Sequence, residues 1–562
     1  MAHDNLDAPV LIVGAGPVGL TLALALGRHG VRSVVVERHQ SISSHPRARF
    51  VHARSMEIFR RLGIEPAVRE TAIPDGLASL VVWAPTLSAP ELRQVEIETL
   101  GPASGEPLSP APGICTSQGL LDPVLHRAVV EDGHAEVRFG WRLTALEQDD
   151  DGVSAVCIDE AGRPAGIRAR YLVGADGARS TVRDLCGIAM PGPPALGHTV
   201  NIHFRADLAA ALRGRPLNMA MILNPAQPGL LLNIDGRETW TAQAIFSPAA
   251  GQSAEEFDEE RCREVVRAQV GDPGLAVEIL GIAPWTSAAR VAEHLAAGRV
   301  VIAGDAAQEM PPAGGFGMNT GIQEADNLAW KLAAVLRGWA SPSLLGTYEE
   351  ERLPLARWIT EQALHNLRSV GRVEGPDGGP PRIGLGRPEF FRERGMVFGA
   401  TYRSRAVVSN GTEQPTVDDP VTEYLPSTTP GCRAPHAWVE VGGHRVSTLD
   451  LVEDGFALVH TGTHSPVLAE AETIARDRGI PLRGFACPEL ARVPAYGLEA
   501  GGMVLIRPDG HVGWRAAGSG AGAADVLAAL GLILGREDVD TQGLTPGGER
   551  LPRSAPPVSP NN

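Results

Sequence analysis

Short apolar runs, each followed by a glycine-containing turn, recur at three places along the chain. The runs Val10–Val13, Arg170–Val173 and Val300–Ala303 have the length and composition of buried parallel strands. Stretches of helical composition follow the first and third runs, over Leu20–His29 and from about Gly317 to Leu336. This alternation predicts an α/β domain with a parallel, Rossmann-like sheet. The domain is expected to be discontinuous and to comprise residues 1–75, 112–190 and 285–395.

A different pattern fills the intervals between these runs. Alternating or continuous apolar runs bounded by turn residues predict strands over His198–Phe204, Leu217–Leu223, Gly229–Ile234 and Thr239–Phe246. We expect residues 76–111 and 191–284 to form an antiparallel-sheet substrate domain that covers the first domain. Candidates to line its pocket, each of which could equally be ordinary core or surface, are Asn218, Met221, Asn233, Trp240 and Gln243.

The last third of the chain changes pattern again. Residues 396–435 are rich in Gly, Pro and Arg and are expected to be a linker. Over 436–536 the order strand, helix, strand, then two strands and a helix predicts a thioredoxin-like domain. Cys487 has no C-x-x-C partner there, so we expect no redox activity. The polar, proline-rich residues 537–562 are expected to be a disordered tail.

Composition excludes several classes of protein. The 562 residues are 43% apolar and 21% charged, and 50 basic against 66 acidic residues give a net charge of −16. This balance argues against nucleic-acid or anionic-membrane partners. The polar N-terminus does not resemble a secretory signal, and no run is long enough for a spanning helix. Six scattered cysteines without metal-ligand spacing favour a reduced cytoplasmic protein without a metal. We expect a monomer or a homodimer, and the sequence leaves both open.

The first apolar run leads into a glycine fingerprint. Gly14, Gly16 and Gly19 follow it, and Glu37 ends the next apolar run. The first glycine permits a tight turn, the second lets a pyrophosphate approach the backbone, and the third lets helix and strand pack closely. An acid at this distance can bind ribose hydroxyls. The pattern predicts a dinucleotide site, although a plain glycine-rich turn is the alternative, and it does not distinguish FAD from NAD.

Further polar residues follow the other predicted strands. Asp176 lies in an Asp-Gly turn after the second run, and Asp305 follows the third. A helix beginning near Gly317 would direct the positive end of its dipole at a bound group. Arg47 and Arg49 precede another predicted helix and could clamp a ligand phosphate, or they could be solvated residues at a helix start.

These turns, in this order and spacing, resemble those of the flavoprotein aromatic hydroxylases related to p-hydroxybenzoate hydroxylase. The stretch Gly314–Leu332 and the segment 507–516 are similar to the large three-domain branch of phenol, chlorophenol and aromatic polyketide hydroxylases. Many relatives carry a histidine after Gly-Asp-Ala-Ala, where this chain has Gln308. The departure puts any proton-handling role of that position in doubt.

The resemblance implies noncovalently bound FAD, with NADPH or NADH as a transient cosubstrate. It assigns the pyrophosphate to the three fingerprint glycines, the adenosine ribose to Glu37, the ribityl chain to Asp305, and the flavin pyrimidine edge to the backbone of Met318 and Asn319. The full set of implied cofactor-binding residues is Gly14, Gly16, Gly19, Glu37, Arg38, Arg47, Gln118, Asp176, Arg179, Asp305, Pro312, Gly315, Gly317, Met318 and Asn319.

The implied reaction is monooxygenation of a phenolic, polycyclic polyketide-type aromatic by a flavin C4a-hydroperoxide formed from O2. Two alternatives stay open: Baeyer–Villiger or decarboxylative oxygenation by the same flavin chemistry, and a non-oxygenating flavin protein that sequesters an intermediate. No catalytic base is assigned, because the predicted sheet strands contain no tyrosine. His52, His198 and His203 are weak candidates, and an acidic substrate such as a hydroxyquinone needs no base.

Overall fold

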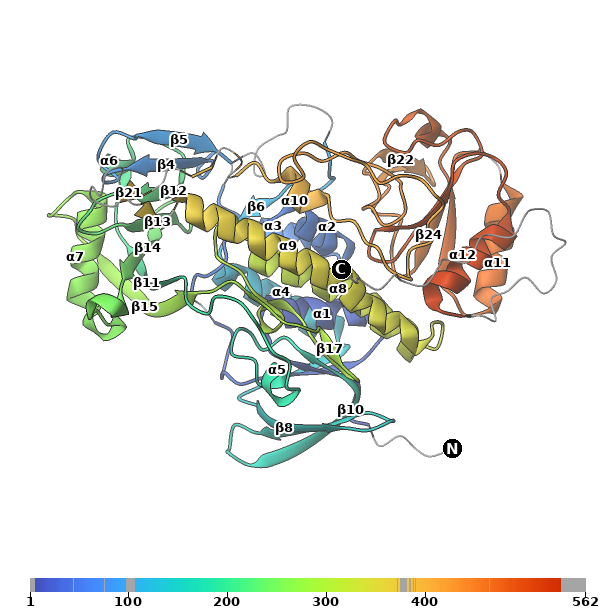
Figure 1. Ribbon diagram of the computed structural model, residues 1–562, viewed down its shortest axis with the longest axis horizontal. Coiled ribbons are helices and arrows are strands. Elements are labelled where there is room, and N and C mark those ends of the chain that lie inside the picture. Colours follow the sequence, from blue (N-terminus) through green and yellow to red (C-terminus); the bar gives the residue numbers. More distant parts are fainter. Residues whose placement is uncertain are drawn as a thin grey trace, which may run out of the picture.

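The computed structural model describes residues 6–536 except 44, 75, 98–106, 371, 374–381, 384–385, 388, 390 and 464. Figure 1 shows three parts side by side. A mixed sheet lies at one end, the α/β domain with the glycine fingerprint, which we call the cofactor domain, lies in the middle, and a C-terminal domain lies at the other end. None of the helices within this described part is long and apolar enough to cross a membrane. The expected disordered tail, 537–562, lies outside the described residues.

The middle domain is built on a sheet with the strand order β17-β18-β10-β1-β2-β7, to which β9 and β8 add a ribbon. Strands β18, β10, β1, β2 and β7 are parallel, so their carboxyl ends share one edge. β10 is longer than the predicted run because its first half pairs with β9. The strands are β1 (Ala8–Val13), β2 (Ser33–Glu37), β7 (Ala135–Phe139), β8 (Arg142–Gln148), β9 (Val153–Ile158), β10 (Pro164–Gly174), β17 (Ala296–Ala297) and β18 (Val300–Ile302).

Helices follow the strand ends of this sheet. α1 packs on α8 and on the turn after β18, where an added Cβ at Gly321 would lie 2.5 Å from Val18 and 3.1 Å from the Cα of Gly304. A short ribbon of β3 (Phe50–Val51) and β6 (Ile114–Cys115) lies beside the start of α8. The helices are α1 (Pro17–Arg28), α2 (Ala53–Arg61), α3 (Glu65–Arg69), α4 (Gln118–Asp132), α5 (Thr181–Leu185), α8 (Phe316–Leu336) and α9 (Gly346–Val370).

The second sheet has the order β15-β11-β14-β13-β12-β4-β5. The predicted antiparallel arrangement is correct except that β4 pairs parallel to β12, because the chain reaches β4 directly from the cofactor domain and not through a hairpin. β15 was not predicted, since Gly281 and Pro284 interrupt its pattern. The strands are β4 (Leu80–Ala84), β5 (Arg93–Glu96), β11 (Gly197–Arg205), β12 (Leu217–Ile222), β13 (Gly229–Asn233), β14 (Thr239–Phe246) and β15 (Glu278–Ser287).

The two faces of this sheet are packed differently. One face lies against α7 (Glu259–Val270) and contributes Phe204 and Trp240 to an apolar core with Val265. The opposite face looks toward the cofactor domain. It packs on residues from the β3 strand, the 311–315 loop and the segment after α9. We call this second group the seam cluster; its main members are Phe50, Trp83, Met219, Met221, Leu232, Ala313 and Phe391.

The C-terminal domain has a four-stranded sheet in the order β25-β24-β26-β27, with α11 and α12. β24 and β25 are parallel and joined by α11, and β26 and β27 are antiparallel, which confirms the thioredoxin-like arrangement. The segment expected to be a linker is tied to β27 through Gly431 N–H to Val512 O, at 2.8 Å. The elements are β24 (Phe456–His460), α11 (Pro466–Asp477), β25 (Leu482–Ala486), β26 (Met503–Ile506), β27 (Val512–Ala516) and α12 (Ala523–Leu534), with β22 (Trp438–Val441), β23 (His444–Ser447) and α10 (Arg394–Phe398) outside this sheet.

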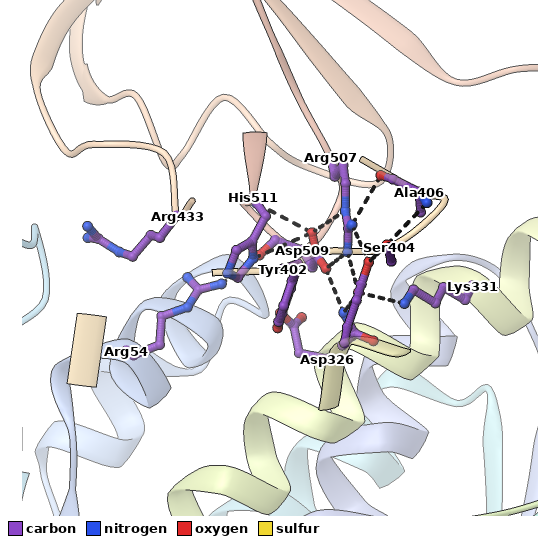
Figure 2. Close-up of polar contacts among 12 residues, drawn as sticks. Arg54, Asp326, Lys331, Tyr402, Ser404, Ala406, Arg433, Arg507, Asp509 and His511 are labelled. Atoms are coloured by element: carbon purple, nitrogen blue, oxygen red, sulfur yellow. Dashed lines mark hydrogen bonds and ion pairs between the residues drawn. The ribbon is translucent and has the colours of Figure 1, made fainter. Parts of the chain in front are cut away.

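A buried ionic cluster joins this domain to α8 and α9. Arg507 donates to both carboxylate oxygens of Glu351, at 2.6 and 2.8 Å, and to Asp509. Lys331 pairs with Glu351 at 2.7 Å. Figure 2 shows Arg507 and Lys331 approaching from different elements, with Asp509 beside Arg507. These four residues, which we call the balanced cluster, carry two positive and two negative charges and are almost fully buried.

Candidate cofactor and substrate site

The sequence-predicted cofactor residues gather where the parallel strands end. The turns after β1, β10 and β18 meet there because these strands are neighbours in the sheet: Ala175 N–H donates to Val13 O at 2.8 Å, and Ala303 N–H to Gly174 O at 2.9 Å. A crevice outside the carboxyl ends of parallel strands is where α/β sheets bind ligands. The strand order therefore assembles the fingerprint glycines, Asp176 and Asp305 at one edge.

The glycine fingerprint fits a pyrophosphate. Gly14 has φ +107°, and a Cβ there would lie 2.3 Å from Ala175 O, while a Cβ at Gly19 would lie 2.0 Å from Gly14 O. These two glycines are required by packing. Gly16 has no atom within 4 Å of a Cβ, so its backbone is open to a ligand. Since Gly16 caps α1 without a side-chain hydrogen bond, amides of the first turn are free to bind an anion.

Glu37 connects the fingerprint to the second strand. Its carboxylate accepts Ala15 N–H at 2.9 Å and His39 N–H at 2.9 Å. These bonds orient the side chain at the end of β2, beside the glycine turn, as a ribose-binding acid requires. Arg38, the next residue, is exposed.

Asp305 follows the end of β18 and lies near the first turn of α8. Its side chain is exposed to solvent, yet surrounding protein, together with Glu309, raises its pKa to about 6, and Arg47 opposes the shift. Its Oδ1 would lie 3.9 Å from a Cβ at Gly317 in the first turn of α8. A carboxylate in this position can accept hydrogen bonds from the polyol chain of a flavin cofactor. Since Gly317 has no side chain, it does not cover the carboxylate.

Gln118 contacts Asp122, a carboxyl group close to Arg47. Its Nε2 donates to Asp122 at 3.0 Å, and burial raises the pKa of Asp122 to about 7, with Arg47 opposing. Arg47 is exposed and therefore able to reach a ligand between Asp305 and Asp122. Sequence reasoning missed Asp122, although its i,i+4 spacing from Gln118 on a predicted helix was a usable signal.

The start of α8 offers free amides. Gly315 caps it with φ +71° and no side-chain hydrogen bond, so by helix geometry the amides of Phe316, Gly317 and Met318 lack intrahelical partners. The amide of Asn319 is the first that pairs inside the helix. Its side chain instead joins α8 to β3, donating to Phe50 O and Gly315 O at 2.8 Å each. We therefore expect Met318, and not Asn319, to present its amide to a flavin.

Other predicted cofactor residues have local partners. Asp176 accepts hydrogen bonds from the Ser180 hydroxyl and from Val182 N–H at 3.1 Å, so it organises the turn that begins α5. Arg179 and Pro312 are exposed. Gln308 is buried and donates to Glu324 at 2.9 Å, pointing away from solvent. Glu324, which also accepts Gly304 N–H at 2.8 Å, was not anticipated from the sequence.

The five pocket candidates divide between the two faces of the second sheet. Met221 belongs to the seam cluster. Leu230 in β13 is paired with Met221 in β12 on one side and with Gln243 in β14 on the other. Since directly paired residues share a face of the sheet, Gln243 lies on the same face as Met221. The prediction for Trp240 is wrong: strand alternation directs it into the core beneath α7. Asn218 and Asn233 are buried and both contact Arg49.

The candidate histidines do not form a base at the seam. His52 is buried, contacts Gly314 O at 3.2 Å, and burial lowers its pKa to about 4. His203 stands edge-on to His45, 6.1 Å between ring centres, and burial lowers its pKa. The His198 ring forms a hydrogen bond with the Thr286 hydroxyl at 3.1 Å. The catalytic base therefore stays unassigned.

Comparison with known proteins identifies the class. The FAD binding domain family matches residues 7–363, and the family of C-terminal domains of aromatic-ring hydroxylases matches residues 427–536. Because the first match covers more than half of the chain, the protein belongs to the FAD-dependent aromatic-ring hydroxylases. The predicted family, the FAD cofactor and the assignment as a flavin-dependent monooxygenase are confirmed.

Individual relatives match nearly the whole chain. A putative polyketide hydroxylase of Streptomyces halstedii is 39% identical over 540 residues, which cover 90% of this chain and 93% of the relative. The flavin-dependent monooxygenase PieE, solved with FAD and substrate, has a TM-score of 0.85 at 33% identity and covers 94% of this chain and 100% of its own. Aklavinone-11 hydroxylase, solved with FAD and aklavinone, has a TM-score of 0.84 at 34% identity, covering 95% and 100%.

Proposed function

We propose that the protein hydroxylates a polycyclic phenolic aromatic of the polyketide type, using NADPH or NADH and O2. The observation that carries the proposal is the juxtaposition of two surfaces. The free amides of α8 and Asp305 lie on one side, and the seam cluster with Met219 and Met221 lies on the other. The solved relatives that bind FAD with an aromatic substrate support it.

Different residues of this chain would contact different parts of the cofactor and the substrate. The fingerprint glycines and α1 hold the pyrophosphate, Glu37 the ribose, and Asp305 with Arg47 the ribityl region. When bound, FAD supplies the electron transfer and the oxygen activation. Positive amide dipoles at the start of α8 stabilise negative charge on the reduced cofactor. The apolar seam cluster orients a flat ring and excludes water from it.

The test is NADPH and NADH oxidation by the purified FAD-loaded protein, with hydrogen peroxide quantified in parallel. The aromatics would range from simple phenols to polycyclic hydroxyquinones. Strong stimulation with little peroxide, and one oxygen from 18O2 in a hydroxylated product, is the expected result. An oxygen inserted next to a carbonyl would replace hydroxylation by the Baeyer–Villiger alternative. Oxidation that responds to no aromatic would contradict the proposal.

A further inference from the structure

Arg49 is a buried guanidinium without a carboxylate partner. It is 6% exposed, and no ion pair reaches it from the part of the chain that the structure describes. Burial lowers its pKa, and Cys115 is the one titratable neighbour that opposes this. Because arginine keeps its charge in proteins, this place carries an unneutralised positive charge.

Every hydrogen-bond partner of Arg49 within the described part of the chain is a neutral group. Its Nη1 donates to Asn218, to the side-chain oxygen at 3.2 Å and to the backbone oxygen at 3.4 Å. Its Nη2 donates to Asn233 O and to Cys115 Sγ, the latter at 3.4 Å. The Nε–H has no partner among the described residues. These contacts fix the direction of the guanidinium without cancelling its charge.

Arg49 lies between the start of α8, in the cofactor domain, and the second sheet. The next residue, Phe50, receives the Asn319 side-chain amide on its carbonyl at 2.8 Å and packs with Ala313 in the seam cluster. The side chain of Arg49 reaches Asn218 in β12 and Asn233 in β13, and it contacts Cys115, which belongs to the seam cluster. The charge therefore lies beside the apolar surface that the proposed function assigns to the substrate.

We propose that Arg49 binds an ionised oxygen of the aromatic substrate and so selects aromatics that carry an acidic hydroxyl. The inference rests on the proposed function, because it takes the seam cluster as the place of the ring. An anion beside Arg49 would offset the cost of burying an unpaired charge and accept a charge-assisted hydrogen bond. The neutral ligands around the guanidinium leave that anion to come from outside the chain.

The ionised hydroxyl suits the reaction. The phenolic O–H bond breaks as the proton passes to solvent, and the remaining phenolate directs electron density to its ortho and para carbons. Those carbons become better nucleophiles, which supply the electron pair of the new C–O bond to an electrophilic oxygen. A nearby cation lowers the pKa of the bound hydroxyl, so no side-chain base is needed. The sheet strands β4, β5 and β11–β15 indeed contain no tyrosine.

The experiment measures the protonation state of bound probes in the FAD-loaded protein. Alizarin, juglone and 1-hydroxyanthraquinone change colour on ionisation, and difference absorption spectra taken against pH report their bound form. In the unmodified protein we expect at least one probe to ionise about one pH unit lower when bound than when free. Arg49→Gln should abolish this shift and weaken binding of the anion about 10–100-fold. The corresponding O-methyl ether should bind equally to both proteins.

Two further variants separate binding from structure. Arg49→Lys keeps the charge and should keep part of the spectral shift, and it serves if Arg49→Gln does not fold. Arg215→Gln is the matched control. Arg215 belongs to the sheet domain that Arg49 contacts, but it donates to Leu87 O and to Glu91 away from the seam cluster. It should change neither spectrum nor affinity.

Three outcomes would overturn the proposal: probes that bind in neutral form, an Arg49→Gln effect equal for hydroxyl and ether, or binding of none of the probes. Failure of the proposed function gives results different from failure of the Arg49 site. Coupled hydroxylation of a phenolic aromatic that proceeds equally well in Arg49→Gln would retain the function and remove Arg49 from it. Arg49-dependent anion binding without oxygen transfer to any aromatic would retain the anion site and contradict the function.

Discussion

The molecule buries charge in two contrasting ways. In the balanced cluster, Lys331, Glu351, Arg507 and Asp509 neutralise one another at the junction of the C-terminal domain with α8 and α9. At the seam, Arg49 is also buried, but its partners among the described residues are all neutral. Paired buried charges fix an arrangement of elements, whereas an unpaired one stays costly until a ligand completes it. The contrast separates residues that hold domains together from residues kept for a ligand.

Removing one member of the balanced cluster should give the largest effect on stability. Glu351→Ala leaves Lys331 and Arg507 with Asp509 alone, so we expect a loss of about 3–5 kcal/mol. Urea unfolding followed by tryptophan fluorescence would measure it. The control is Glu350→Ala, whose exposed pair with Arg405 should contribute less than about 1 kcal/mol. Equal effects of the two variants would mean that the cluster does not anchor the domain.

His52 shows a third solution, in which a buried group stays neutral. Its pKa is lowered to about 4 from 6.5, so the unfolded chain binds the proton more tightly than the folded one. Its contribution to stability is therefore present above pH 6.5 and is lost as pH falls from 6.5 toward 4, by up to about 3 kcal/mol. His52→Gln should flatten this part of the stability profile. His39→Gln, at an exposed histidine, should not.

Asp305 is the acidic counterpart of Arg49. It has no ion pair among the described residues and lies at the end of β18. Asp305→Ala should weaken FAD binding about 10–100-fold, because hydrogen bonds from the cofactor lose a charged acceptor. Flavin fluorescence on titration of the apoprotein would measure it, with the exposed Asp184→Ala as control. Unchanged affinity would place the ribityl chain elsewhere.

Residues fixed by local sequence patterns could be predicted, whereas residues whose surroundings come from distant segments could not. The places of Gly14, Gly19 and Asp305 after strand ends could be predicted from the sequence, because turns at strand ends impose residue types at fixed spacing. The face of Trp240 was mistaken because helix α7 covers that side of the sheet, and local alternation does not say which face a helix will cover. Arg49 was noted only as a possible phosphate clamp. Its significance comes from missing partners, which depend on segments as distant as β12 and β13.

The smallest expected effect tests the contrast most directly. Arg49→Met removes an unneutralised buried charge but also takes one donor from Asn233 O and one from the Asn218 side-chain oxygen, so the two terms largely cancel. The free energy of unfolding should change by no more than about 1 kcal/mol in either direction. Arg507→Met, at an arginine of similar burial, leaves two carboxylates unpaired and should lose about 3–5 kcal/mol in the same urea titration. A loss at Arg49 as large as that at Arg507 would show that its neutral partners already complete a structural site. A small change together with lost anion binding would show that the charge is retained for the ligand at no gain in stability.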